Sequence, residues 1–189
     1  MTDSRALILI DIQKGFDDPF WGARNNPEAE ANAARLLTHW RAKSWPVFHI
    51  QHLSTTPGSP LNPDGGAVDF KPEVTPLPNE PVLTKHVNAA FIGTDLEARL
   101  RAASVTSVVI CGLTTPHCVS TTSRMAANLG FDVTLPHDAC AAFTGNADAG
   151  WRNVTTPTRP PTAHDIHVAA LDHLNGEFAC VCTTDEVMG

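Results

Sequence analysis

The sequence predicts an α/β protein in which helices cover both faces of a mostly parallel sheet. Short apolar runs alternate with segments in which apolar residues recur at helical spacing, the pattern of successive βαβ units. Several runs are apolar without a break, as in parallel strands that are buried on both faces. A chain of 189 residues with 42% hydrophobic residues is large enough for one domain over residues 1–189.

The first half of the chain predicts three strands and one helix. The strands are expected at residues 6–11, 46–50 and 82–85. Asn26 followed by Pro27 is typical of a helix start, because proline fits the first helical position. Apolar residues then recur at helical spacing as far as Trp40. Residues 54–81 are rich in Pro, Gly, Ser and Asn and lack a period, so we expect a long surface loop there.

The second half predicts three more strands, at residues 107–111, 132–135 and 179–182. A helix start of capping-box form lies at Thr94–Glu97. The helix after the strand at 107–111 is expected to end at Gly130, because glycine favours the left-handed end of a helix. A second long loop is expected at residues 144–161, and a last helix at residues 162–174.

Composition and charge exclude several classes of protein. The net charge is −7 and Lys and Arg form no cluster, so we expect no nucleic-acid partner. No apolar run approaches the length of about 20 residues that crosses a bilayer, and the N-terminus lacks a signal peptide's cleavage region. Five cysteines without a CxxC pair predict neither a disulfide framework nor a zinc ribbon. A reducing cytoplasm is the expected location.

Polar residues follow three of the apolar strands. Asp11, Lys85 and Cys118 lie at or just after predicted strand ends, where open α/β sheets form their sites. Cys118 also lies at a predicted helix start, where unpaired N–H groups and the helix dipole lower a thiol pKa. An Asp that takes the proton and a Lys that stabilises the thiolate would complete a nucleophile. Taken singly, the three residues also fit a turn cap, a solvated lysine and a packing cysteine.

Four sequence blocks surround these residues: Leu9–Phe16, then Lys85–Phe91 with Thr94–Leu96, then Gly112–Val119 with Thr121–Ala126, and Asp138–Phe143. With these blocks the chain resembles the isochorismatase-like cysteine hydrolase superfamily, from about Ala6 to Phe143 and more loosely to Val187. The resemblance implies a three-layer α/β/α sandwich with a six-stranded, mostly parallel, Rossmann-like sheet. It also implies a homo-oligomer, either a dimer or a tetramer.

The resemblance implies a catalytic triad. Cys118 would be the nucleophile, Asp11 would accept its proton and later activate water, and Lys85 would orient the pair and stabilise negative charge. Relatives have a cis peptide bond at the position of Leu113–Thr114, which aims the N–H groups of Thr114 and Cys118 at an oxyanion. The implied reaction attacks the acyl carbon of an amide, imide or carbamoyl group in a small molecule. The C–N bond breaks, and the thioester is then hydrolysed.

We expect no metal and no cofactor. Nicotinamidase-type relatives bind a metal through an Asp-x-His motif, whereas residues 49–54 read His-Ile-Gln-His-Leu-Ser. Residue type alone allows a metal at His49 and His52, but residues three apart on a strand face opposite sides. His164 and His167 have the spacing of surface histidines on the last predicted helix.

The substrate pocket is harder to predict than the triad. Aromatic residues in the matching blocks are candidate pocket walls, although core packing explains each equally well: Phe16, Trp21, Phe91 and Phe143. The loops at 54–81 and 144–161 are expected to cover the pocket. Two other readings stay open. One is ether-bond hydrolysis by Asp11 and Lys85 with Cys118 as a bystander, and the other is a non-catalytic binding protein on the same scaffold.

Overall fold

A seven-stranded sheet forms the centre of the computed structural model, which describes residues 5–151 and 159–189. The strands are β1 (Arg5–Ile10), β2 (Val47–His52), β3 (Val82–Lys85), β4 (Ser107–Leu113), β5 (Asp132–Pro136), β6 (Cys140–Ala141) and β7 (Cys180–Cys182). Their order is β3-β2-β1-β4-β5-β7, β6 pairs with β4, and every pairing is parallel. The six predicted strands are all present, and the two-residue β6 is too short to give a sequence signal.

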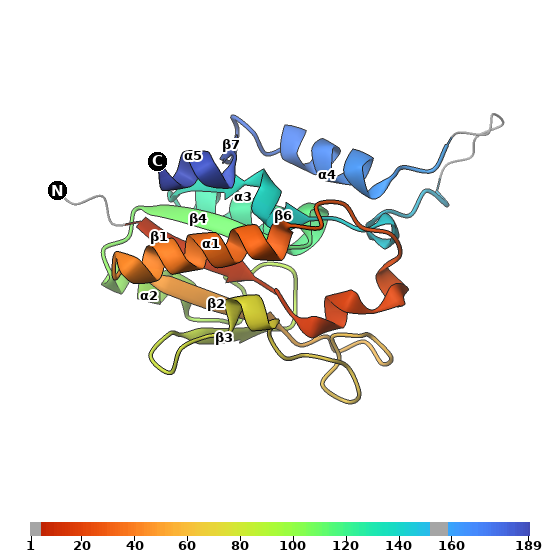
Figure 1. The fold of residues 1–189 in the computed structure, drawn as a ribbon, viewed down its shortest axis with the longest axis horizontal. Coiled ribbons are helices and arrows are strands. Elements are labelled where there is room, and N and C mark those ends of the chain that lie inside the picture. The colour runs from red at the N-terminus through yellow and green to blue at the C-terminus, as the bar shows by residue number, and fades with distance from the viewer. Residues whose placement is uncertain (1–4, 152–158) are drawn as a thin grey trace.

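Five α-helices pack on the sheet: α1 (Ala29–Ala42), α2 (Leu96–Ala102), α3 (Ser120–Asn128), α4 (Ala163–Asp172) and α5 (Thr184–Met188). Helices α1 and α5 contact each other, and Figure 1 shows α1 lying across the front of β1 and β4. Right-handed crossovers place α2 and α3 on the opposite face. There Arg101 of α2 donates to the Leu129 carbonyl at the end of α3, at 2.6 Å. The predicted three-layer α/β/α sandwich is confirmed.

Short turns of helix complete the fold. Most are 3-10 turns: η1 (Lys14–Asp17), η2 (Pro19–Trp21), η3 (Pro72–Val74), η5 (His137–Ala139) and η6 (Thr144–Asn146). The turn η4 (Thr115–Val119) is a π-helical turn between β4 and α3. The segments that join the carboxyl ends of β1 and β2 to the next elements gather at one edge of the sheet (Figure 1).

The order of the strands reverses between β1 and β4. From β1 the chain proceeds to β2 and β3 on one side, and from β4 it proceeds to β5 and β7 on the other. Such a switch point opens a crevice at the carboxyl ends of the two central strands. Gly112 near the end of β4 is required there, because its φ is 124° and an added Cβ would lie 2.1 Å from the Ile10 carbonyl oxygen.

Two predicted helix starts were wrong. Asn26 does not cap α1, because its side chain donates to the carbonyls of His137 and Cys140 at 3.1 and 2.8 Å. The helix begins three residues later. The capping box at Thr94 is also absent, since the Glu97 carboxylate binds Arg101 at 3.3 Å instead of the backbone. At Asn26 tertiary partners compete with the local pattern, whereas at Glu97 the competing partner lies one turn later in the same helix.

The long loop between β2 and β3 packs closely on the segment that follows β1. The N–H of Gly15 donates to the Ala67 carbonyl at 2.7 Å, and the N–H of Lys71 donates to the Ile12 carbonyl at 3.0 Å. This contact brings the predicted loop 54–81 to the edge where β1 ends. Of the second predicted loop, 144–161, residues 152–158 lie outside the described residues.

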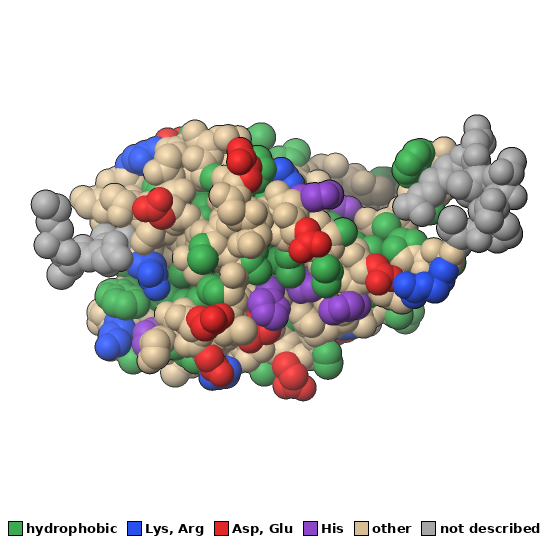
Figure 2. Space-filling model, turned by 90° about the horizontal axis from the view of Figure 1, so that it is seen from above, with side chains coloured by type: hydrophobic (Ala, Val, Ile, Leu, Met, Phe, Trp, Pro, Cys, Tyr) green, Lys and Arg blue, Asp and Glu red, His purple; other side chains and the backbone are tan. Residues whose placement is uncertain are grey.

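The described residues can be compared with two expectations from the sequence, that the chain crosses no membrane and that it binds no nucleic acid. Within the described residues no helix combines the length and the apolar character that crossing a membrane requires. On the face drawn in Figure 2, Lys and Arg side chains are scattered among Asp and Glu side chains. The described part of that face therefore offers no continuous basic patch for a nucleic acid.

Candidate active site

The three candidate catalytic residues meet in the crevice at the switch point. Asp11 directly follows β1, Lys85 ends β3 and Cys118 lies in η4 after β4. Their exposed fractions are 0%, 1% and 7%. The Lys85 ammonium donates to Asp11 Oδ2 at 2.6 Å and to Cys118 Sγ at 3.3 Å. The structure thus brings Lys85 together with residues that lie 74 and 33 positions away in the sequence.

Cys118 is held by an unusual turn rather than by the first turn of an α-helix. The peptide bond between Leu113 and Thr114 is cis, as expected. The π-helical turn follows, in which the Val119 N–H donates to the Thr114 carbonyl at 3.2 Å, and α3 begins only at Ser120. The expected α-helical start at Cys118 was therefore wrong by two residues, and Cys118 lies in the π-helical turn that precedes the helix.

Electrostatics favour a neutral thiol in the resting site. Burial raises the pKa of the Cys118 thiol, the negative charge of Asp11 raises it further, and Lys85 opposes both effects only in part. Burial also raises the pKa of Asp11, and the Lys85 ammonium opposes that rise. The argument from a helix dipole alone predicted a lowered thiol pKa, and the buried environment reverses it.

A base lies beside the thiol. One carboxylate oxygen of Asp11 lies within 4.8 Å of Cys118 Sγ. Asp11 Oδ1 is buried and has no hydrogen-bond partner among the described residues, so this oxygen is free to accept a proton. The arrangement can move a proton from sulfur to carboxylate as the sulfur attacks, without a standing thiolate.

A fourth member of this cluster is His52, which sequence reasoning considered only as a metal ligand. It is the last residue of β2, directly opposite Lys85 in the register with β3. Its Nδ1 lies 2.9 Å from Lys85 Nζ. Burial lowers the pKa of His52 to about 4, and the charges of Lys85 and His86 act in the same direction, so the ring is neutral at pH 7. The predicted strand stopped at residue 50, two residues too early to reveal a polar residue at its end.

An oxygen, a nitrogen and a sulfur of Asp11, His52 and Cys118 all lie within 4.8 Å of one another. This donor set matches a metal site in type. However, Lys85 Nζ contacts all three groups, at 2.6, 2.9 and 3.3 Å, so the cation that they hold is the ammonium. His49 faces the other side of β2, where its Nε2 lies 2.9 Å from Glu80.

The aromatic candidates do not form one wall. Phe16, Trp21 and Phe143 lie together, with ring centroids 4.8 to 6.3 Å apart, in a small cluster that includes Leu113 beside the cis bond. Phe91 lies elsewhere, in the main core, where it stacks on Phe131 at 6.2 Å.

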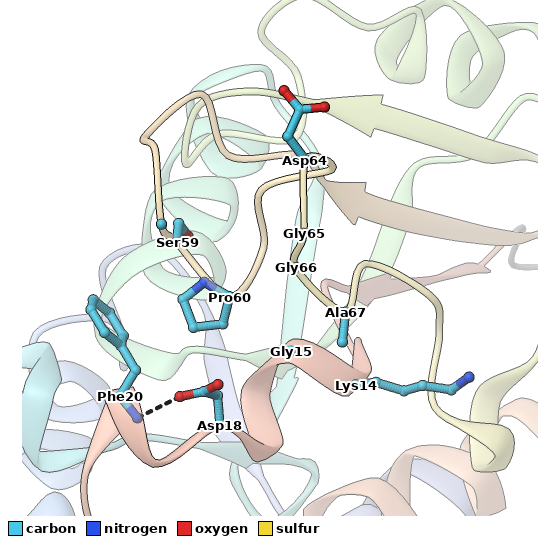
Figure 3. A pocket seen from close by; sticks show the side chains of 11 residues that line it. Lys14, Gly15, Asp18, Phe20, Ser59, Pro60, Asp64, Gly65, Gly66 and Ala67 are labelled. Carbon is cyan, nitrogen blue, oxygen red and sulfur yellow. Dashed lines mark hydrogen bonds between the residues drawn. The ribbon is translucent and has the colours of Figure 1, made fainter.

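A surface pocket lies beside η1 and η2, but the three candidate catalytic residues do not line it. It has a volume of about 360 Å³ and lies between η1, η2 and residues 58–67, with Gly15, Pro60 and Ala67 in its wall (Figure 3). None of Asp11, Lys85 and Cys118 lines it. Cys118 instead contacts exposed Asn88, whose Oδ1 lies 3.6 Å from the thiol sulfur. Asn88, which sequence reasoning missed, thus lies where a ligand would approach the sulfur.

His167 of α4 contacts the π-helical turn that holds Cys118. The sequence predicted a surface histidine, but its exposed fraction is 2%. Its Nδ1 lies 2.8 Å from the hydroxyl of Thr115, the first residue of the π-helical turn. Burial lowers its pKa to about 4, with smaller contributions from the nearby charges of His137 and His164.

Comparison with known proteins identifies the family. The family model for the isochorismatase domain matches residues 5–186. The uncharacterized isochorismatase family protein YrdC of Bacillus subtilis is 47% identical over 189 residues, which are all of this chain and 96% of that protein. A crystal structure assigned to the same family, from Chromobacterium violaceum, has a TM-score of 0.89 and 42% identity and covers 99% of this chain and 93% of the other.

The names of some relatives state a reaction, among them the streptothricin hydrolase of Streptomyces noursei, which is 36% identical over 142 residues, 74% of this chain and 50% of that protein. The ureidoacrylate amidohydrolase RutB of Cronobacter turicensis is 36% identical over 118 residues, which are 62% of this chain and 47% of that protein. The family match extends over the whole sheet and both helical layers, including the strand ends that hold Asp11, Lys85 and Cys118. The chain belongs to the isochorismatase family and is a hydrolase of that family.

Proposed function

We propose that this protein hydrolyses a C–N bond in a small molecule, of the amide, imide or carbamoyl type, through a thioester on Cys118. One observation carries the proposal: the buried ammonium of Lys85 contacts both a carboxylate and a thiol. A base and a counter-charge next to a thiol are what a cysteine nucleophile requires. The amidohydrolase among the relatives supports the same type of bond.

Asp11 transfers each proton in the proposed cycle. It takes the Cys118 proton as the sulfur bonds to the acyl carbon, and it returns that proton to the nitrogen as the C–N bond breaks and the amine leaves. Water then gives a proton to Asp11 while its oxygen attacks the thioester carbon. The C–S bond breaks, the sulfur recovers the proton from Asp11, and the acid is released. Lys85 stays protonated and offsets the negative charge on sulfur and carboxylate.

The N–H groups of Thr114 and Cys118 are the proposed oxyanion hole. Loss of one such donor typically lowers the rate by about 10²–10³. Because Lys85 occupies the centre of the only mixed N, O, S donor cluster found among the described residues, we propose a reaction without a metal.

Access to the sulfur supports a small substrate, since Cys118 is only 7% exposed and lies behind Asn88. We propose that Phe16, Trp21 and Phe143 form an apolar wall beside Leu113, whereas Phe91 acts in the core. All five cysteines are free thiols, which fits the proposed reducing cytoplasm. We also propose a dimer or a tetramer, which sedimentation velocity would detect.

Ammonia or amine release from a panel of amides, imides and carbamoyl compounds tests the proposal. We expect turnover in the native protein, none in Cys118→Ala with an unchanged fold, and a mass increase on Cys118 when the thioester is trapped by acid. Hydrolysis of an ether bond by both the native protein and Cys118→Ala would instead favour the alternative that uses Asp11 and Lys85 without Cys118. Binding without turnover of any compound would favour the non-catalytic alternative.

A further inference from the structure

The Lys85 ammonium has a complete set of three acceptors. It donates to Asp11 Oδ2 at 2.6 Å, His52 Nδ1 at 2.9 Å and Cys118 Sγ at 3.3 Å. An ammonium carries three N–H donors and no acceptor. The side chain of Lys85 is fully buried, so a donor without a partner there would carry the full cost of desolvation. The three acceptors come from three separate segments: the end of β1, the end of β2 and η4.

The tautomer of His52 follows from this contact. Because Lys85 can only donate, Nδ1 of His52 must carry the lone pair, and Nε2 must carry the proton. A neutral ring is required for this, and the ring is neutral at pH 7 because burial and the neighbouring charges of Lys85 and His86 disfavour the imidazolium. His86 itself faces away, with Nδ1 2.8 Å from the Leu53 carbonyl.

We propose, on the basis of the role proposed above for Lys85, that His52 is a positioning residue of the catalytic centre. Its Nδ1 fixes the rotation of the ammonium, so that one N–H points at Asp11 and another at the Cys118 sulfur. Without this third acceptor the ammonium turns away from the sulfur to satisfy its free N–H. The thiolate that forms during attack then loses part of its counter-charge.

Two substitutions, one without and one with a hydrogen-bond acceptor, separate this role from simple packing. His52→Phe keeps a ring, excludes water and removes the acceptor. His52→Asn places its Oδ1 about where Nδ1 lies and therefore keeps the acceptor. Since a hydrogen bond to a charged group contributes more than a neutral one, we expect alkylation of Cys118 by iodoacetamide at pH 7.5 to slow about tenfold in His52→Phe. It should stay within about threefold of the native rate in His52→Asn.

A double-mutant cycle with Lys85→Met tests the route of the effect. If His52 acts through the ammonium, His52→Phe slows alkylation in the native background and has no further effect in Lys85→Met. The rates are followed by mass spectrometry across pH 6–9, and thermal unfolding is measured for each variant. Equal slowing by His52→Phe in both backgrounds would overturn the proposal, as would equal rates in the Phe and Asn variants.

Failure of the proposed function would look different. In that case neither Lys85→Met nor His52→Phe would alter the alkylation of Cys118, whose rate would match that of an ordinary buried thiol. If His52→Phe loses cooperative unfolding, His52→Leu provides the acceptor-free arm of the same cycle. The exposed Cys180 serves as an internal standard, since no variant in the cycle touches it.

Discussion

Replacing Asp11 by asparagine should make Cys118 more reactive toward iodoacetamide and yet abolish hydrolysis. The Asp11 carboxylate raises the pKa of the thiol, so its removal favours the thiolate beside Lys85. For a separation of at most 4.8 Å and an effective dielectric constant of about 20, the repulsion is at least about 3.5 kcal/mol. An energy of that size changes an ionisation equilibrium by about 300-fold. The asparagine dipole retains part of it, so we expect alkylation at pH 7 to rise about 10- to 100-fold.

Hydrolysis should fall in the same variant because no group remains to carry the proton to the leaving nitrogen. General acid–base catalysis of this kind contributes about 10²–10⁴ in rate. The assay compares the carbamidomethylation of Cys118 and of exposed Cys180 by peptide mass spectrometry at pH 6–9, alongside amine release. Slower alkylation of Cys118 in Asp11→Asn would refute the reasoning, because it would mean that Asp11 keeps Cys118 deprotonated in the resting enzyme.

Three further outcomes follow from the geometry. Cys118→Ala should lose turnover but keep stability within about 1 kcal/mol in urea unfolding, and a larger loss would mean that the thiol is structural. Gly112→Ala should lower the free energy of unfolding by more than about 3 kcal/mol, because the added Cβ would collide with backbone. Gly130→Ala, where the added Cβ meets open space at a φ of 85°, should lower it by about 1 kcal/mol. Equal losses in the two variants would contradict the argument. The pKa of the buried His167 is about 4 in the folded protein and 6.5 in the unfolded chain, so the unfolded chain binds the proton first and stability falls as the pH drops from 6.5 to 4. In His167→Gln the free energy of unfolding in urea should therefore depend less steeply on pH. An unchanged dependence would show that His167 is not the source of the pH effect.

Strands and their ends could be predicted from the sequence because parallel strands leave a local signal. Short, mostly apolar runs identified six strands, and the polar residues that closed them identified Asp11 and Lys85. The same rule would have found His52, had the second strand been extended to its true end. The helix start at Asn26 failed because its side chain binds carbonyls distant in the sequence. The start at Thr94 failed because local hydrogen bonds, from Thr94 to the Ala90 carbonyl and from Arg101 to Glu97, replace the capping box.

The α/β class, the six main strands and the residue types at their carboxyl ends can be derived from the amino-acid sequence, because hydrophobic period and strand ends are local properties. The protonation of the site and its fourth member depend on how distant segments pack. Whether Cys118 rests as a thiol depends on its burial and on the distances to Asp11 and Lys85, and His52 reaches the ammonium only through the register of β2 and β3. These are properties of distance and dielectric environment, which exist only once distant segments have packed together.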